Sequence, residues 1–292
     1  MKFFDRINNV LHLNDSDQVA FAPYIESFPT GEFERTPRNR GMGLVVRKPT
    51  VWEATPHVTV EHKTEGDLTV YIYHTPKGDL RSAYKQHSGR LYIEEEGVCV
   101  EGMLKGLPDY EPLIFMIEDT EFHADNTLYS DTMRDLGGDG LFTEYGCAMT
   151  PYGYARYLFG DTSGFDKWIF EQADHPREFA RLLEAIVARE ERRMEFIVKS
   201  PAEYVRLGDI DGSWGPKDVK RYDLPFIKKW VPYLQSHGKI LCVHAHAINL
   251  AFFKEIIAEM GYNVVEAFTP PPVGNLSLSE AIQIAEFLQP YP

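Results

Sequence analysis

The stretch that decides the fold is KILCVHAHA, residues 239–247, a short apolar run that ends in two histidines. A short apolar run bounded by polar residues is typical of a strand buried in a parallel sheet. Residues two apart on a strand share a face, so His244 and His246 point the same way, together with Cys242. We expect Cys242, which lies deeper in the strand, to belong to the core.

Short strands alternate with helices on both sides of this stretch. Further strands are predicted at 139–147, 204–210 and 263–268, and the segments between them have helical spacing. This alternation predicts parallel strands with crossover helices, arranged either as an open doubly wound sheet or as a (β/α)8 barrel. No G-x-G-x-x-G motif follows any of these strands, which weighs against a dinucleotide-binding fold.

The N-terminal part of the chain has a different pattern. Residues 18–25 (QVAFAPYI) predict a buried strand, and residues 31–43, with Arg35, Arg38 and Arg40, predict a surface loop. Between 58 and 105, apolar and polar residues alternate around turn signals, which predicts an inserted antiparallel hairpin region. We interpret this region as an excursion from one domain that spans residues 1–292.

Composition limits the partners that we expect. The chain has 292 residues and a formal net charge of −14, so it should repel the phosphates of a nucleic acid. It has no apolar run of the roughly 18 residues that span a bilayer and no signal peptide, so we expect no membrane contact. Three widely spaced cysteines favour a reducing cytoplasm over a disulfide framework.

Polar side chains occur where the predicted parallel strands end, which is where α/β folds place their sites. His244 and His246 on one face, with Glu266 from the next strand, predict a site for a transition metal. The alternative is that the histidines are polar strand-end residues or that one is a general acid. Asp209 and Asp211 predict a catalytic role, and a solvated turn is their alternative.

Two aromatic residues are candidates for binding a cofactor. Trp214 follows the two aspartates and could stack on an aromatic or tetrapyrrole ligand. Tyr154 lies at the start of a predicted helix after the strand at 139–147, where a helix N-terminus can attract an anion. Packing over the core explains Trp214 equally well, and packing is the more common role of aromatic residues crowded into a short stretch such as that of Tyr154.

An ordered set of segments in the second half resembles the uroporphyrinogen decarboxylase superfamily. The resemblance runs from about residue 109 to the end, and no single motif carries it alone. Its segments are DHPREFARLL (174–183), GDIDG (208–212), DLPFIKKW (223–230), HGKILCVHAH (237–246) and GYNVVEAFTPPPVGNLSLSEA (261–281). The resemblance implies a (β/α)8 barrel, which agrees with the strand–helix alternation.

The superfamily contains true decarboxylases and zinc methyltransferases that serve corrinoid proteins. The decarboxylases carry RQAGRY after the first strand, and here that place reads APYIESFPTGEFER (22–35), without the arginine pair. The methyltransferases carry H-x-C where this chain has His244-Ala245-His246, and a distant cysteine that has no counterpart here. The resemblance therefore implies zinc at His244 and His246, a small-molecule methyl donor or acceptor, and a corrinoid carried by a partner protein.

Two other functions remain open at this stage. The first is a metal-free decarboxylase with Arg35, Arg38 and Arg40 at the mouth of the barrel, and the second is a non-catalytic ligand-binding barrel. About six barrel strands can be counted before Pro292, where the family continues with two more strand–helix units. We therefore expect a barrel that is incomplete at its C-terminus, whose open strand edges oligomerisation could cover.

Overall fold

The structure is a computed structural model. It describes residues 1–12, 14–25, 31–85, 97–147, 149–160, 164–210, 215–245 and 249–285. The chain forms two compact units, each made of segments that are discontinuous in sequence. Unit 1 comprises Met1–Trp52, Ala124–Thr150 and Glu195–Pro292, and unit 2 comprises Glu53–His123 and Pro151–Met194. The expectation of a single domain over residues 1–292 remains a prediction.

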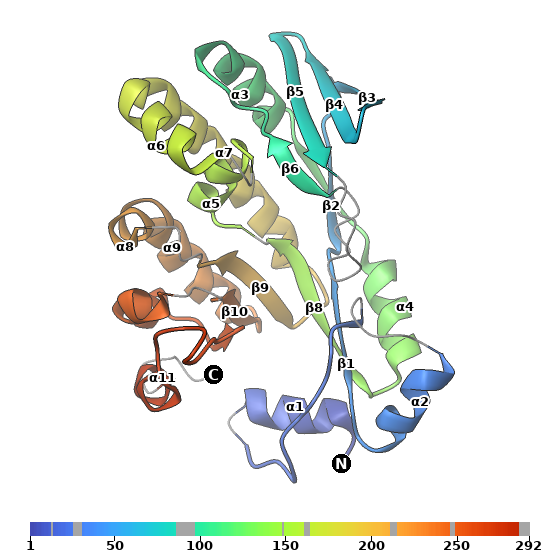
Figure 1. The fold of residues 1–292 in the computed structure, drawn as a ribbon. Helices are drawn as coiled ribbons and strands as arrows, with labels where there is room; N and C mark the ends of the chain where they lie inside the picture. The colour runs from blue at the N-terminus through green and yellow to red at the C-terminus, as the bar shows by residue number, and fades with distance from the viewer. Residues whose placement is uncertain are drawn as a thin grey trace. The chain divides into compact units, whose positions relative to one another are not determined.

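Unit 1 is built on a parallel sheet of five strands, which lie in the sheet in the same order as in the sequence (Figure 1). Each neighbouring pair is parallel, as the strand–helix alternation predicts. The strands are β1 (Leu44–Lys48), β8 (Gly140–Cys147), β9 (Tyr204–Asp209), β10 (Ile240–His244) and β11 (Val264–Glu266). The protein is therefore an α/β fold in which sequence order and spatial order coincide.

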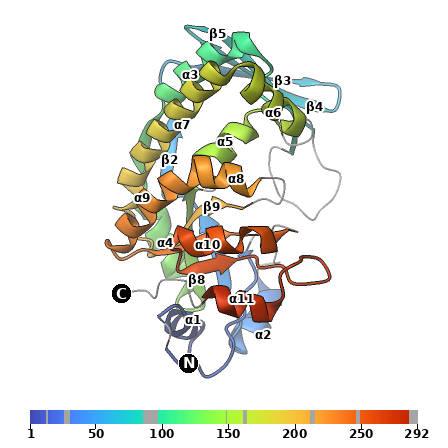
Figure 2. The same cartoon turned by 90° about the vertical axis from the view of Figure 1, so that its left-hand side faces the viewer.

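Helices lead into and follow these strands. Gly137 ends α4 and Gly261 ends α10, both with left-handed backbone (φ 65° and 76°), so glycine terminates these helices as it commonly does. The helices are α4 (Asn126–Leu136) before β8, α7 (Pro176–Ile197) before β9, α8 (Pro216–Asp218), η3 (Val219–Asp223) and α9 (Leu224–Gln235) before β10, η4 (Leu250–Phe253) and α10 (Lys254–Met260) before β11, and α11 (Leu278–Ala285) after it. Figure 2 shows α10 and α11 beside one another.

The predicted eight-stranded barrel is not found. Within the described residues the sheet has five strands and does not close. The predicted buried strand at 18–25 is wrong as well, because Val19 and Phe21 are 88% and 67% exposed. The segment keeps only a bridge from Tyr24 to Val45. The carbonyls of Phe21 and Pro23 accept hydrogen bonds from the backbone N–H groups of Gly43 and Val45. Pro23 has no N–H to donate, so regular strand pairing fails there.

One face of this parallel sheet, here called the inner face, carries most of the polar strand residues. The registers align them into rows, because paired residues on neighbouring parallel strands share a face. The inner face consists of Val45 and Arg47 on β1, Leu141, Thr143 and Tyr145 on β8, Tyr204 and Arg206 on β9, Ile240, Cys242 and His244 on β10, and Val264 and Glu266 on β11.

Helix α1 (Phe3–Leu11) packs at the amino-terminal end of the inner face. Leu11 packs with Leu141 and Val264 against a buried cluster of Tyr204, Ile240 and Cys242. The thiol of Cys242 is fully buried, as its place in the middle of the strand predicts. The polar residues of the inner face are therefore gathered toward the opposite, carboxyl end of the strands.

Unit 2 contains an antiparallel sheet of four strands in the order β3-β4-β5-β6. These strands occupy the region where alternation of apolar and polar residues predicts hairpins. They are β3 (Thr59–Glu65), β4 (Leu68–Thr75), β5 (Gly78–Lys85) and β6 (Val98–Glu101), and helix α3 (Tyr110–Glu118), which follows η2 (Leu107–Asp109), contacts β4 and β5. The unit also holds α5 (Pro151–Tyr157), α6 (Gly164–Asp174) and most of α7, while β2 (Val51–Ala54) pairs with β7 (Glu121–Ala124).

No helix among the described residues has both the length and the apolar character that crossing a membrane would require.

Glu144, on β8, faces away from the inner face and forms a buried polar centre. Its carboxylate is fully buried and accepts hydrogen bonds from the backbone N–H of Thr50 at 2.9 Å, from the Thr50 hydroxyl and from the Ser200 hydroxyl at 3.1 Å. The buried ammonium of Lys239 donates nearby to the carbonyls of Ser200 and Ala202, the latter at 2.8 Å. On the face of the sheet opposite the inner face, these contacts join β8 to the segments that follow β1 and α7 and to the residue that precedes β10.

We expect Glu144→Ala to lower the free energy of unfolding of unit 1 by about 3 kcal/mol, because it leaves several buried donors without an acceptor. Urea denaturation followed by circular dichroism measures this loss. The exposed Glu195→Ala is the matched control and should change the free energy by less than about 0.5 kcal/mol. Equal effects of the two substitutions would contradict the structural role of Glu144.

Candidate functional site

Glu266, the last residue of β11, is the centre of the polar cluster on the inner face. Its Oε1 lies 2.8 Å from Nδ1 of His244 and 2.9 Å from the hydroxyl of Tyr24. Its Oε2 lies 3.4 Å from the thiol of Cys242. One carboxylate therefore gathers three side chains, and both it and His244 are mostly buried, at 14% and 16% exposed.

The charge state of Glu266 follows from these contacts. Burial raises its pKa, but hydrogen bonds from His244 and Tyr24 and the charge of Arg206 outweigh burial and lower the pKa from 4.5 to about 2. The carboxylate is then ionised at neutral pH and can only accept, so Nδ1 of His244 carries the proton that it donates. A neutral His244 consequently presents Nε2 as its acceptor nitrogen.

Tyr24 connects the two edges of the sheet. It lies beside β1 through its bridge to Val45, whereas Glu266 lies on β11 at the other edge. Strands are about 4.8 Å apart, so a flat sheet would separate these positions by about 24 Å. The 2.9 Å contact therefore requires a strongly curled sheet. Burial and the neighbouring Glu266 raise the pKa of the Tyr24 hydroxyl to about 12, so it remains a donor.

Two arginines, Arg47 on β1 and Arg206 on β9, lie on the same face on the two strands that flank β8 and its Tyr145. The guanidinium carbon of Arg206 lies 4.7 Å from the centre of the Tyr145 ring, and that of Arg47 lies 5.5 Å from it. Arg47 also stacks on Tyr24 at 3.8 Å. Burial lowers the pKa of Arg206, but Tyr145, Asp209 and Glu266 outweigh it and raise the pKa. Both guanidinium groups thus lie over aromatic rings, and cation–π attraction stabilises their positive charges.

A bulge at the end of β9 aims Asp209 at this cluster. Pairing shifts between Arg206–Cys242 and Asp209–His244, and Gly208 within the shift has φ 86°. A Cβ at Gly208 would lie 2.8 Å from the Thr150 methyl, so both the backbone conformation and the space require glycine. Asp209 thereby accepts from Nη2 of Arg206 at 3.0 Å.

The strand ends are fixed by backbone bonds between neighbours. The N–H of Ile210 donates to the carbonyl of His244 at 2.8 Å, and that of Ala245 donates to the carbonyl of Glu266 at 2.9 Å. Ala267 then turns the chain away with φ 58°, a conformation that costs a non-glycine residue about 1 kcal/mol. The carboxyl ends of β9, β10 and β11 are therefore held together where the polar cluster lies.

The structure brings together only part of the predicted site. His244, Glu266 and Asp209 all lie on the inner face at the carboxyl ends of neighbouring strands. His246, Asp211 and Trp214 lie outside the described residues. Tyr154 lies in unit 2, where the guanidinium carbon of Arg189 lies 4.7 Å from its ring centre. A cofactor-binding role for Tyr154 remains a prediction.

Zinc, which the resemblance implies, finds part of its donor set here. His244 and Glu266 lie in contact, and a carboxylate bound to one imidazole nitrogen is the usual way of orienting a metal-ligating histidine. Among the described residues no group of three or more His, Cys, Asp or Glu is arranged to hold a metal ion. The donor types therefore fit zinc at His244, with Glu266 orienting the imidazole, and the further ligands would have to come from residues such as His246. A role of Glu266 as a direct metal ligand remains a prediction.

The arginines that sequence analysis singled out lie elsewhere. The predicted loop at 31–43 contains a helix, α2 (Glu32–Asn39). Arg38 pairs there with Glu34 at 3.0 Å and with Asp139 at 3.4 Å, just before β8 begins, while Arg35 and Arg40 are exposed. The pairing with Asp139 puts Arg38 at the amino end of β8, so it does not serve a mouth at the carboxyl ends.

Three residues of the cluster were not predicted, namely Tyr24, Arg47 and Arg206, whereas Tyr145 lies on a strand whose polar end is expected at this edge. A signal existed for two of them, because a charged residue inside a short apolar strand, as in LVVRK (44–48) and YVRLGD (204–209), must point at a partner or a site. Tyr24 gave no such signal, since its partner is 242 residues away.

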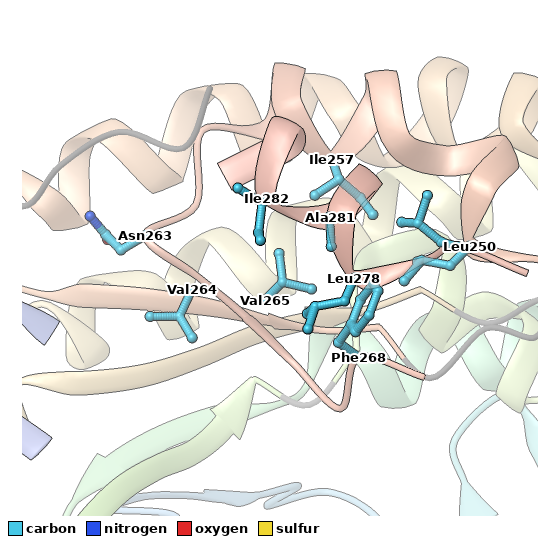
Figure 3. A pocket seen from close by; sticks show the side chains of 10 residues that line it. Leu250, Ile257, Asn263, Val264, Val265, Phe268, Leu278, Ala281 and Ile282 are labelled. Atoms are coloured by element: carbon cyan, nitrogen blue, oxygen red, sulfur yellow. The ribbon is translucent and has the colours of Figure 1, made fainter. Parts of the chain in front are cut away.

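A separate cavity of about 370 Å³ lies between β11, α10 and α11 (Figure 3). Its walls are apolar except for Asn263, whose side-chain oxygen already accepts from the backbone of Leu241 and from Gln235. The residues that line it include no acid, base or metal ligand.

Comparison with known proteins finds similarity at the level of structure. No family model matches the chain, and no curated protein sequence matches it. Among solved structures, a methyltransferase from Methanosarcina mazei aligns with 100% of this chain and 81% of its own, at 12% identity and a TM-score of 0.47.

We expect Tyr24→Phe to lower the free energy of unfolding by about 2 kcal/mol, because it removes a hydrogen bond to a charged, mostly buried carboxylate. Chemical denaturation of both proteins measures the difference. Tyr233→Phe removes the hydroxyl of a tyrosine that is 42% exposed and serves as the control. A Tyr24→Phe protein as stable as wild type would contradict the link between the two sheet edges.

The lowered pKa of Glu266 predicts a loss of stability in acid. A carboxyl group whose pKa falls from 4.5 to about 2 on folding stabilises the fold fully above pH 4.5, and this stabilisation is lost as pH falls toward 2. In Glu266→Gln this contribution should vanish, so its unfolding free energy should depend less steeply on pH between 5 and 2. Denaturation at several pH values tests this, and parallel curves for both proteins would refute it.

Proposed function

We propose that this chain is a methyltransferase that uses zinc bound at His244 and His246 to activate a small-molecule methyl donor or acceptor, with a corrinoid protein as its partner. The observation that supports it is the 2.8 Å contact between Glu266 and Nδ1 of His244 at the carboxyl ends of the parallel strands. The sequence segments that resemble the corrinoid-linked methyltransferases carry the finer assignment.

In this proposal Glu266 and Tyr24 prepare His244 for its task. The ionised carboxylate fixes the proton of His244 on Nδ1, and the Tyr24 hydroxyl donates to the same oxygen and holds the carboxylate in place. Nε2 of His244 would then be free of the carboxylate and could hold zinc, as in other histidine ligands oriented by carboxylates. Asp209, at the neighbouring strand end, is suited to hold a proton or to contact the substrate.

When bound, zinc would act as a Lewis acid, lowering the pKa of a thiol acceptor or polarising the leaving group of a methyl donor. The residues described here contribute one oriented imidazole and a shielded polar surface. His246 is the second ligand that the sequence offers.

A metal-free decarboxylase is the second candidate, and one observation favours it. Arg47 and Arg206 lie on the same face as the Glu266–His244 pair, where they could hold an acidic substrate while His244 moves a proton. The two candidates differ in their need for metal, so metal content separates them.

The first test is elemental mass spectrometry on the purified protein. We expect about one zinc per chain, and a His244→Ala/His246→Ala double variant should lose it, because it lacks both imidazoles. His237→Ala removes an exposed histidine and should keep the metal. A second measurement on the same proteins follows methyl transfer to a corrinoid through the change in the absorbance of the corrinoid. Protein that holds no zinc after zinc has been offered and the excess removed would refute the methyltransferase and favour the decarboxylase or a binding role.

A further inference from the structure

Arg206 lies deep in the inner face with part of its hydrogen-bonding capacity unused. Its side chain is 4% exposed, and Nη2 donates to Asp209 at 3.0 Å. Its Nε is buried and has no hydrogen-bond partner among the described residues. The hydroxyl of Thr143, on the neighbouring strand of the same face, is also buried without a partner among them. Native proteins give nearly all such groups a partner, so these atoms point to a bound polar group.

The Nε–H donor of Arg206, unused within the described part of the chain, favours a hydrogen-bond acceptor, and therefore an anion over a cation. The guanidinium carbon of Arg47 lies 5.5 Å from the centre of the same Tyr145 ring, so Arg47 adds a second positive charge nearby. The nearest carboxylates are already engaged, since Glu266 accepts from His244 and Tyr24, and Asp209 accepts from Arg206. An arginine presents its N–H groups as a planar fork that matches the two oxygens of an oxyanion.

The two arginines are also held in advance. Arg47 stacks on Tyr24 at 3.8 Å, and Arg206 lies 4.7 Å from the Tyr145 ring centre. Because these rings fix the guanidinium planes, little side-chain entropy remains to be lost when an anion binds. Such a pre-formed pair, beside the Glu266–His244 contact, has the character of a substrate subsite.

We infer that Arg206 and Arg47 form a subsite that binds the anionic group of the small molecule on which the inner face acts. This group is a carboxylate or another oxyanion with two oxygens that a guanidinium group can bind. This inference rests on the proposed function only in taking the inner face as the active site. It names the part of the substrate that is held, while the Glu266–His244 pair faces the part that reacts.

Direct binding measurements test the subsite without any catalytic assay. Isothermal titration with propionate, ethanesulfonate and inorganic phosphate distinguishes the anion classes, and propionamide is the neutral match for propionate. We expect at least one anion to bind saturably and propionamide not to bind. Arg206→Gln should weaken anion binding by at least about tenfold, because it removes a charged fork, whereas Arg134→Gln, at a side chain 71% exposed, should leave it unchanged.

A variant that should bind anions more tightly than wild type strengthens the test. Asp209→Asn removes the carboxylate that competes for Arg206, so we expect several-fold tighter anion binding. Should Arg206→Gln fail to fold by circular dichroism, Arg206→Lys keeps the charge and loses the fork, and it should still bind more weakly than wild type. Binding of no anion, or binding that these substitutions do not change, would overturn the subsite.

The outcome is separable from that of the proposed function. Zinc and methyl transfer without arginine-dependent anion binding would overturn the subsite and leave the methyltransferase. Arginine-dependent anion binding by a protein that takes up no zinc would support the subsite and refute the methyltransferase.

Discussion

The arrangement of the inner face depends on one ionised carboxylate. Glu266 accepts from His244 on the neighbouring strand and from Tyr24 beside the opposite edge of the sheet, and both contacts fall on the same oxygen. A carboxylate in so enclosed a place remains charged only because these donors compensate for the loss of water. The contact is therefore possible only in a curled sheet, and it fixes the orientation of the imidazole.

The remaining polar groups of the face follow from that curvature. Once the sheet is curled, Arg47, Tyr145 and Arg206 converge from three strands that are successive in the sheet. The bulge at Gly208 adds Asp209 to the same side. Behind the sheet, Glu144 gathers hydroxyl and backbone donors in a separate buried centre. The two faces of β8 thus differ, with the polar cluster around Tyr145 on one side and the buried Glu144 centre on the other.

Much of the sheet could be predicted from sequence, because its signals are local. KILCVHAHA and NVVEAF fix two neighbouring strands by their apolar runs, and the spacing of His244 and Glu266 from those runs places both at strand ends. Three features could not be predicted in this way. The segment before Tyr24 fails as a strand because Pro23 lacks a donor, Glu144 turns to the far face through strand alternation, and Tyr24 meets Glu266 only after the whole sheet has curled. Such contacts depend on tertiary geometry that no short window of sequence contains.

The distance in sequence between Tyr24 and Glu266 affects how the protein can be made. A chain that emerges from the ribosome displays Tyr24 long before β11 exists, so His244 lacks its carboxylate until the last strand has been synthesised. Closing a loop of 242 residues is also slow compared with forming the local hairpins of unit 2. The nascent protein should therefore acquire much of its secondary structure first, and the contacts of Glu266 with His244 and Tyr24 should form last.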